Sequence, residues 1–246
     1  MIPLFRKVRK KMADDNRPVQ YMRYAAGEIA LVVIGILIAL QINNWNEERK
    51  ERNEEQKLLR NLHIEFKTNY DNLKERDSVL EITIQSIEFV FEQMAKPTEV
   101  QQHKNVDSLL SKMLSSPTWS PSEYVLNDLK NSGNLTKLSS QKLKSLLFEW
   151  SRFFSLLSEN QQQVETTSKE LIAFIKENGS LRNVDAGDLN FNYSKSILFS
   201  NNETLLSNYK FENYLDDKLY VLKISRRDYS NAEKLILKIL DETTVK

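Results

Sequence analysis

The feature that most constrains this chain is an apolar stretch of nineteen residues from Tyr24 to Ile42, which only Glu28 and Gln41 interrupt. As an α-helix this stretch is about 28 Å long, close to the thickness of the hydrocarbon core of a bilayer. Its uninterrupted apolar part, Ile29 to Leu40, is short enough to suit a buried helix or a signal peptide as well. The flanking residues favour a retained transmembrane helix over residues 24–42.

These flanks differ from those of a signal peptide. The preceding segment is longer than a normal signal n-region, and Ala39-Leu40-Gln41 does not end in the small residue that a cleavage site needs. Tyr21, Tyr24 and Trp45 stand where aromatic rings settle at the two interfaces of a membrane. We therefore expect the lipid bilayer to be a permanent partner of the chain.

The charges on the two sides of the span predict its orientation. Residues 1–23 carry seven Lys and Arg against two Asp, whereas residues 43–60 carry five charges of each sign. The more basic flank of a span stays in the cytoplasm. We thus expect a cytoplasmic tip over residues 1–23 and place residues 43–246 in the periplasm, with the span in the inner membrane. The tip orients the span and could also lie on the anionic inner leaflet.

Some residues within the span suit a contact with another membrane helix. An acid in a span is by default a functional hypothesis, but Glu28 lies only about 6 Å inside Tyr24, from where its carboxylate can reach the interface. Gly27, Gly35 and Ala39 are small, and Gly35-x-x-x-Ala39 has a spacing that permits close helix association. Whether Glu28 is an interface ion or a helix contact stays open.

The stretch from Gly27 to Glu47, GEIALVVIGILIALQINNWNE, resembles the opening of an uncharacterised bacterial family of single-pass membrane proteins. This family is classed as a domain of unknown function. The similarity continues into Thr118-Trp119-Ser120-Pro121 and residues 126–133, so we expect it to cover the whole chain. The resemblance implies a membrane-anchored protein of unknown activity, and it supplies no catalytic residue, ligand or partner.

The composition predicts an all-α protein. Only five Gly and five Pro occur among 246 residues, well below the usual shares of about 7% and 5%, so tight turns and Gly-rich phosphate loops must be few. The absence of Cys excludes disulfides and thiolate metal sites, and two His leave little for histidine chemistry. A net charge of +1 argues against binding of nucleic acid.

Residues 43–57 predict a charged helical stalk, because Glu and Lys or Arg recur at helical spacing without an apolar side chain from Asn46 to Lys57. A disordered linker is the alternative, but Gly, Pro and Ser are missing. A heptad-like apolar seam typical of a coiled coil follows and predicts a helix that ends near Pro97. The seam comprises Leu59, Leu62, Phe66, Tyr70, Leu73, Asp77, Leu80, Ile84, Ile87, Phe91 and Met94.

The apolar pattern predicts two more long helices, over residues 140–177 and 209–241. Shorter helices are expected near residues 105–115, 121–131 and 201–208, and residues 178–200 form the longest expected loop. The transmembrane helix would thus continue into a long helix of an antiparallel helical bundle over residues 58–246. Either the later helices or a second copy could fill the seam, and additional apolar residues beside it favour the chain's own helices.

Ser120-Pro121-Ser122-Glu123 reads as a capping box that begins the helix over residues 121–131. Trp119 and Tyr124 are placed as a hydrophobic staple around this start, and Gly133 as the stop. The alternative is that Trp119 lines a ligand pocket or that Trp119 and Tyr124 form a partner surface.

No motif for catalysis, a cofactor or a metal is visible, and neither His63 nor His103 has ligand-like neighbours in sequence. We therefore expect no cofactor and a non-enzymatic, membrane-anchored interaction or scaffold protein that binds an envelope protein or itself. The alternative is an extracytoplasmic ligand-sensing domain that signals through a membrane partner. An enzyme whose cleft is built from distant residues would leave no such motif.

Overall fold

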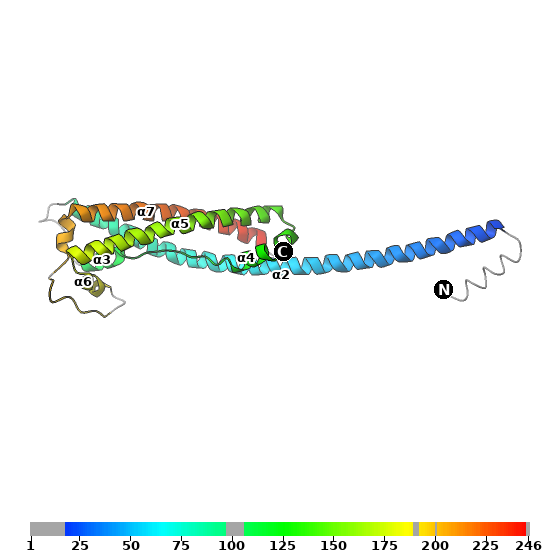
Figure 1. The fold of residues 1–246 in the computed structure, drawn as a ribbon, viewed down its shortest axis with the longest axis horizontal. Helices are drawn as coiled ribbons and strands as arrows, with labels where there is room; N and C mark the ends of the chain where they lie inside the picture. Colours follow the sequence, from blue (N-terminus) through cyan, green and yellow to red (C-terminus); the bar gives the residue numbers. More distant parts are fainter. Residues whose placement is uncertain (1–17, 97–105, 189–191, 200, 245–246) are drawn as a thin grey trace. The chain divides into compact units, whose positions relative to one another are not determined.

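The computed structural model describes residues 18–96, 106–188, 192–199 and 201–244. All regular elements in these ranges are helices, which confirms the all-α prediction (Figure 1). The chain divides into two compact units, residues 1–57 and 58–246. Most of the basic tip and His103 lie outside the described residues.

The longest helix, α2, runs from Pro18 to Met94 and ends where the sequence predicts. It begins with proline, whose missing N–H costs nothing in the first turn of a helix. Within the first unit, the apolar side chains from Ile29 to Ile42 are exposed. α2 is the single helix in the described ranges that is long and apolar enough to cross a membrane.

The charged segment over residues 43–57 is helical, as predicted. Two of the expected pairs form ion pairs on its surface, Lys50 with Glu47 at 3.0 Å and Arg52 with Glu48 at 3.8 Å. Such exposed pairs each stabilise a helix by only about 0.2–0.5 kcal/mol. Because residues 46–57 contain no apolar side chain, this part of the segment has no apolar face to bury.

The second unit is built on three long helices: α2 from Leu58 onward, α5 (Gln141–Asn178) and α7 (Tyr209–Thr243). α7 runs antiparallel to both of the others (Figure 1). Its early residues meet the late residues of α2 and α5, and its late residues meet their early ones. The pairs that mark this register are Lys223–Glu88, Arg226–Glu81, Lys74–Glu233, Asn160–Asp228 and Lys142–Glu242.

Five short elements connect these helices. They are α3 (Val106–Met113), α4 (Tyr124–Asn131), α6 (Leu181–Gly187) and the 3-10 helices η2 (Asn134–Lys137) and η3 (Glu203–Ser207). The expected loop over residues 178–200 is therefore wrong in part, since it contains α6. The expected helix near residues 201–208 is a short 3-10 helix. Because α3 and α4 lie at opposite ends of the bundle, α2 and α5 run in the same direction (Figure 1).

At two positions, the structure explains why the residue is a glycine. Gly133 follows α4 in the left-handed region, with φ of 73°, and so ends the helix as predicted. Gly187 lies against the N-terminal end of α3, where a Cβ atom would come within 2.5 Å of the backbone of Asp107. The contact between α6 and α3 thus requires a residue without a side chain.

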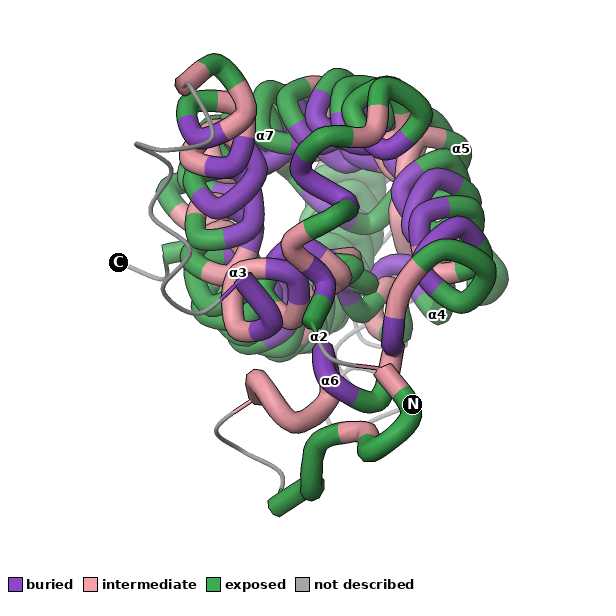
Figure 2. Tube along the Cα trace, turned by 90° about the vertical axis from the view of Figure 1, so that its left-hand side faces the viewer, coloured by how far each residue is buried: buried purple, intermediate pink, exposed green. Residues whose placement is uncertain are grey.

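The seam of α2 is buried by the later helices of the same chain. Six of its residues are fully buried: Leu62, Phe66, Leu73, Leu80, Ile84 and Ile87. Val90 beside the seam is also buried, whereas Ile64 and Ile82 are exposed. The end view in Figure 2 shows the buried positions of α5 and α7 facing inward. A second copy is therefore not needed to fill the seam.

Candidate functional site

The second unit is organised around an extended segment, residues 115–123, which we call the strap. Ser116 and Ser120 each precede a proline, and that position disfavours helical backbone. Side chains along the strap alternate, with Pro117, Trp119 and Pro121 buried and the residues between them more exposed. The strap is thus irregular backbone with a strand-like alternation of side chains, and a backbone bond within it runs from the N–H of Thr118 to the carbonyl oxygen of Ser116 at 2.7 Å.

α7 binds the first part of the strap. The ammonium Nζ of Lys218 donates a hydrogen bond of 3.0 Å to the carbonyl oxygen of Ser115. The hydroxyl of Tyr229 donates one of 2.6 Å to the carbonyl oxygen of Pro117. Proline has no backbone N–H, so this bond satisfies the one polar group that the backbone of Pro117 offers.

α5 and α2 bind the rest of the strap through two side-chain amides. Gln161 of α5 accepts a hydrogen bond from the backbone N–H of Trp119 at 3.2 Å and donates one to its carbonyl oxygen at 2.6 Å. Asn69 of α2 makes the same pair of bonds with Ser122, both at 2.8 Å. Each amide replaces the neighbouring strand that the extended backbone lacks.

The end of the strap and the start of α4 are capped by Glu65 of α2, which is buried. Its carboxylate accepts hydrogen bonds from the Ser122 hydroxyl at 2.7 Å and from the backbone N–H groups of Val125 and Leu126 at 3.0 and 3.3 Å. A carboxylate at a helix N-terminus satisfies unpaired N–H groups and interacts favourably with the helix dipole.

The predicted capping box is wrong for this reason. α4 begins at Tyr124 rather than Pro121, and Glu123, its N-cap residue, makes no side-chain capping bond. The serine that is hydrogen-bonded at the start of α4 is Ser122 rather than the predicted Ser120, and its hydroxyl donates to the carboxylate of Glu65. The cap comes from a residue about sixty positions earlier in the chain, which a local pattern cannot show.

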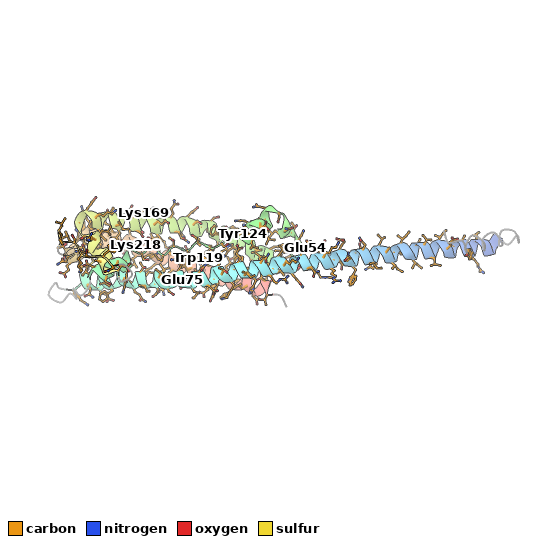
Figure 3. All side chains as sticks on the ribbon, turned by 90° about the horizontal axis from the view of Figure 1, so that it is seen from below. Glu54, Glu75, Trp119, Tyr124, Lys169 and Lys218 are labelled. Carbon is orange, nitrogen blue, oxygen red and sulfur yellow. The ribbon has the colours of Figure 1, made fainter. Side chains whose placement is uncertain are left out.

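Trp119 is a core residue, with 2% of its surface exposed (labelled in Figure 3). Its ring makes edge contacts with Trp150 at 6.1 Å and with Tyr229 at 6.0 Å between centroids, and Phe66 meets Trp150 at 5.1 Å. The predictions that Trp119 belongs to a partner surface and to a staple with Tyr124 are therefore wrong. Tyr124 is 81% exposed, and its role in a partner surface stays a prediction.

Lys218 is the unusual ionisable group of this site. Its side chain is completely buried, and its bond to Ser115 is to a neutral carbonyl oxygen. Burial lowers the pKa of Lys218 to about 7, because the charged form loses its hydration without gaining a carboxylate. Burial likewise raises the pKa of Tyr229, and chiefly by desolvation it raises that of Glu123.

The residues predicted to mediate a membrane-helix contact all lie on α2. Gly27, Gly35 and Ala39 are exposed, and a Cβ atom at either glycine would meet nothing within 4 Å. Glu28 is half-buried. A contact between these residues and a second membrane helix remains a prediction.

Within the described residues, no group of three His, Asp or Glu side chains could hold a metal ion. Nδ1 of His63 lies 3.1 Å from Oγ1 of Thr243, so this histidine joins α2 to the end of α7. The hydrogen bonds and ring contacts of the strap join it to all three long helices.

Comparison with known families gives one result. Residues 28–157 match DUF6090, a family of unknown function. The chain belongs to this family. The matched region extends from the apolar part of α2 through the strap and α4 into the middle of α5, so it includes Glu65, Asn69 and Trp119. Neither the curated proteins nor the solved structures give a match.

We expect Glu65→Ala to lower the free energy of unfolding by about 1–3 kcal/mol, because the Ser122 hydroxyl and two N–H groups would lose their acceptor. Glu65→Gln, which retains one acceptor oxygen, should cost less. Urea unfolding of the full chain in detergent would measure both. Glu75→Ala, an exposed change on the same helix, is the matched control. Equal losses for Glu65→Ala and Glu75→Ala would show that the cap contributes nothing.

Lys218 should make the stability depend on pH. Between pH 7 and its ordinary pKa of 10.5, the unfolded chain binds a proton at Lys218 that the folded chain lacks, so folding becomes more favourable as the pH rises. The slope is about 1.4 kcal/mol per pH unit. Lys218→Met should remove this contribution, so the stability of the variant relative to the wild type should be highest at pH 7 and below.

The measurement is the free energy of unfolding of the wild type and Lys218→Met at several values between pH 6 and pH 9. The free energy of unfolding of Lys218→Met, minus that of the wild type, should fall as the pH rises. Lys238→Met, at an exposed position of α7, should leave the slope unchanged. A constant difference between Lys218→Met and the wild type over this range would contradict the lowered pKa.

Proposed function

We propose that this protein is a non-enzymatic interaction or scaffold protein of the cell envelope, anchored in the inner membrane by residues 24–42. The N-terminus would lie in the cytoplasm, and the bundle of residues 58–246 would lie in the periplasm. There it would bind another envelope protein or a second copy of itself.

One observation supports the assignment of residues 24–42 as a membrane anchor. The apolar side chains between Ile29 and Ile42 are exposed along a stretch of α2, although a chain in water would bury them. The bundle does bury its own apolar seam, so these residues are not left over from an incomplete core. A bilayer is the environment that covers such a helix on all sides. The basic residues before the span support the proposed orientation.

The interaction role is supported by exposed apolar side chains on a bundle whose core is closed. Examples are Tyr124 beside the strap, Phe148 on α5 and Tyr220 on α7. Aromatic residues of this kind are enriched where proteins bind other proteins. Four residues of the strap have backbone groups that are hydrogen-bonded to side chains of the long helices, which favours a structural over a catalytic role.

Ligand sensing is the second candidate. A cleft of about 400 Å³ lies between α2, α3 and the end of α6, lined by Ile82, Ser108, Ser111 and Lys112 among others. This volume suits a small solute. α2, which lines the cleft, is the same helix that contains the span, so a bound solute would have a direct mechanical connection to a membrane partner.

The topology can be tested with single cysteines, because the chain has none of its own. We expect a membrane-impermeant maleimide to label Glu75→Cys in intact spheroplasts and to label Ala13→Cys only after the membrane is opened. Tyr220→Cys should behave like Glu75→Cys. Labelling of Ala13→Cys in intact spheroplasts, with Glu75→Cys protected, would reverse the proposed orientation.

The interaction role predicts reproducible neighbours. Chemical crosslinking in intact membranes, followed by mass spectrometry, should yield crosslinks from exposed lysines of the bundle, such as Lys169 and Lys223, to another envelope protein or to a second copy. A change of the crosslinks on addition of a solute would favour the sensing role. Recovery of monomer alone, with efficient crosslinks inside the bundle, would overturn the interaction role.

A further inference from the structure

The loop over residues 192–199, which we call the tip loop, is held in one conformation by buried polar side chains. Asn183 of α6 is completely buried. Its amide accepts a hydrogen bond from the backbone N–H of Ser196 at 2.7 Å and donates one to the carbonyl oxygen of Phe199 at 3.3 Å. These two bonds flank residues 197 and 198 of the loop.

A second buried group fixes the loop to α3. Asp107 accepts hydrogen bonds from Lys195 of the tip loop at 2.8 Å and from the amide of Asn202 at 2.9 Å. Asn202 is fully buried and also pairs with both backbone groups of Ser180, at 2.7 and 3.1 Å. Buried polar groups are favourable only when they are paired, so this network specifies one position of the loop.

The same loop presents apolar side chains to solvent. Ile197 is 98% exposed and Leu198 is 92% exposed, and we call this pair the apolar knob. Tyr193 of the same loop is half-exposed. Single exposed apolar residues are common on protein surfaces. Two adjacent ones, on a loop that hydrogen bonds to the buried residues Asn183 and Asp107 hold in place, form a preorganised contact element.

A cleft with both apolar and polar lining lies at the same end of the bundle, between the end of α2 and the start of α7. We call it the tip cleft. Its volume is about 340 Å³, and its apolar lining comes from Phe91, Met94, Leu206 and Tyr209. An apolar cavity of about 150 Å³ already accommodates a benzene molecule. The tip cleft is therefore large enough for the side chains of the knob.

The charges beside the knob and the cleft are opposite. Arg182 donates two hydrogen bonds of 2.8 Å to Ser194 of the tip loop and remains exposed. Glu212 lines the tip cleft and is exposed as well. Among the described residues, neither side chain takes part in an ion pair. Opposite charges at the rim of a contact favour the correct orientation of the partners.

We propose that the apolar knob of one copy inserts into the tip cleft of a second copy of this chain. This inference rests on the proposed interaction function and names its partner. Because the knob and the cleft belong to the same chain, two copies can exchange both contacts around a twofold axis. Confinement to one membrane raises the effective concentration of the copies, so a small contact suffices.

The absence of native cysteine allows a direct test. Two differently tagged copies of the full chain, one with Leu198→Cys in the knob and one with Ser207→Cys in the tip cleft, are co-expressed and oxidised in membranes. We expect a mixed disulfide between the two tags. Leu156→Cys, at an exposed position on α5, is the matched control for Ser207→Cys and should give at least tenfold less product.

A second variant separates contact from folding. Ile197→Asp, introduced beside Leu198→Cys, should reduce the mixed disulfide at least tenfold. Its melting temperature should be unchanged, since the replaced side chain touches almost nothing in the fold. Glu212→Lys in the Ser207→Cys copy should also reduce the product. Unchanged yields with both substitutions would overturn the proposed contact.

The remaining outcomes distinguish this inference from the proposed function. A disulfide with Leu156→Cys as abundant as that with Ser207→Cys would mean random collision and would overturn the contact. If Leu198→Cys is captured by a different envelope protein, the self-association is wrong while the interaction role stands. If neither this experiment nor lysine crosslinking recovers a partner, both proposals fail.

Discussion

An extended backbone between helices must find hydrogen-bond partners, and here this requirement determines how the bundle is assembled. The strap has no neighbouring strand, so Gln161, Asn69, Tyr229 and Lys218 supply its bonds from three different helices. A buried carbonyl or N–H without a partner costs about 1–3 kcal/mol. The strap therefore constrains how the three long helices are positioned, because its backbone bonds come from side chains on all of them.

This constraint also explains the connectivity. Three long helices joined by short turns would alternate in direction, but the strap returns the chain along the bundle between α3 and α4 (Figure 1). α5 can then start at the same end as the bundle part of α2 and run parallel to it. α7, which packs against both, is antiparallel to both, and the ion pairs on its two sides follow from that direction.

The long helices were predictable because each presents a continuous apolar stripe, and the positions of α5 and α7 agree with the sequence within a few residues. Prolines at 117 and 121 alternate with Trp119 at a spacing of two, which was the available signal for the strap. A local capping motif, Ser120 to Glu123, suggested a helix instead. Glu65 overrode it through a contact across about sixty residues, and such contacts leave no trace in a local pattern.

Lys218 shows that hydrogen bonding to the strap has an energetic penalty. An ammonium group with only a carbonyl partner is unfavourable in a core, and a methionine of similar size would pack there without that penalty. The lysine nevertheless supplies a donor for the Ser115 carbonyl, which an apolar side chain would leave unpaired. At a pKa of about 7 the amine can lose its proton and still donate an N–H to this oxygen. Above this pH, the neutral amine satisfies the strap without a charge in the core.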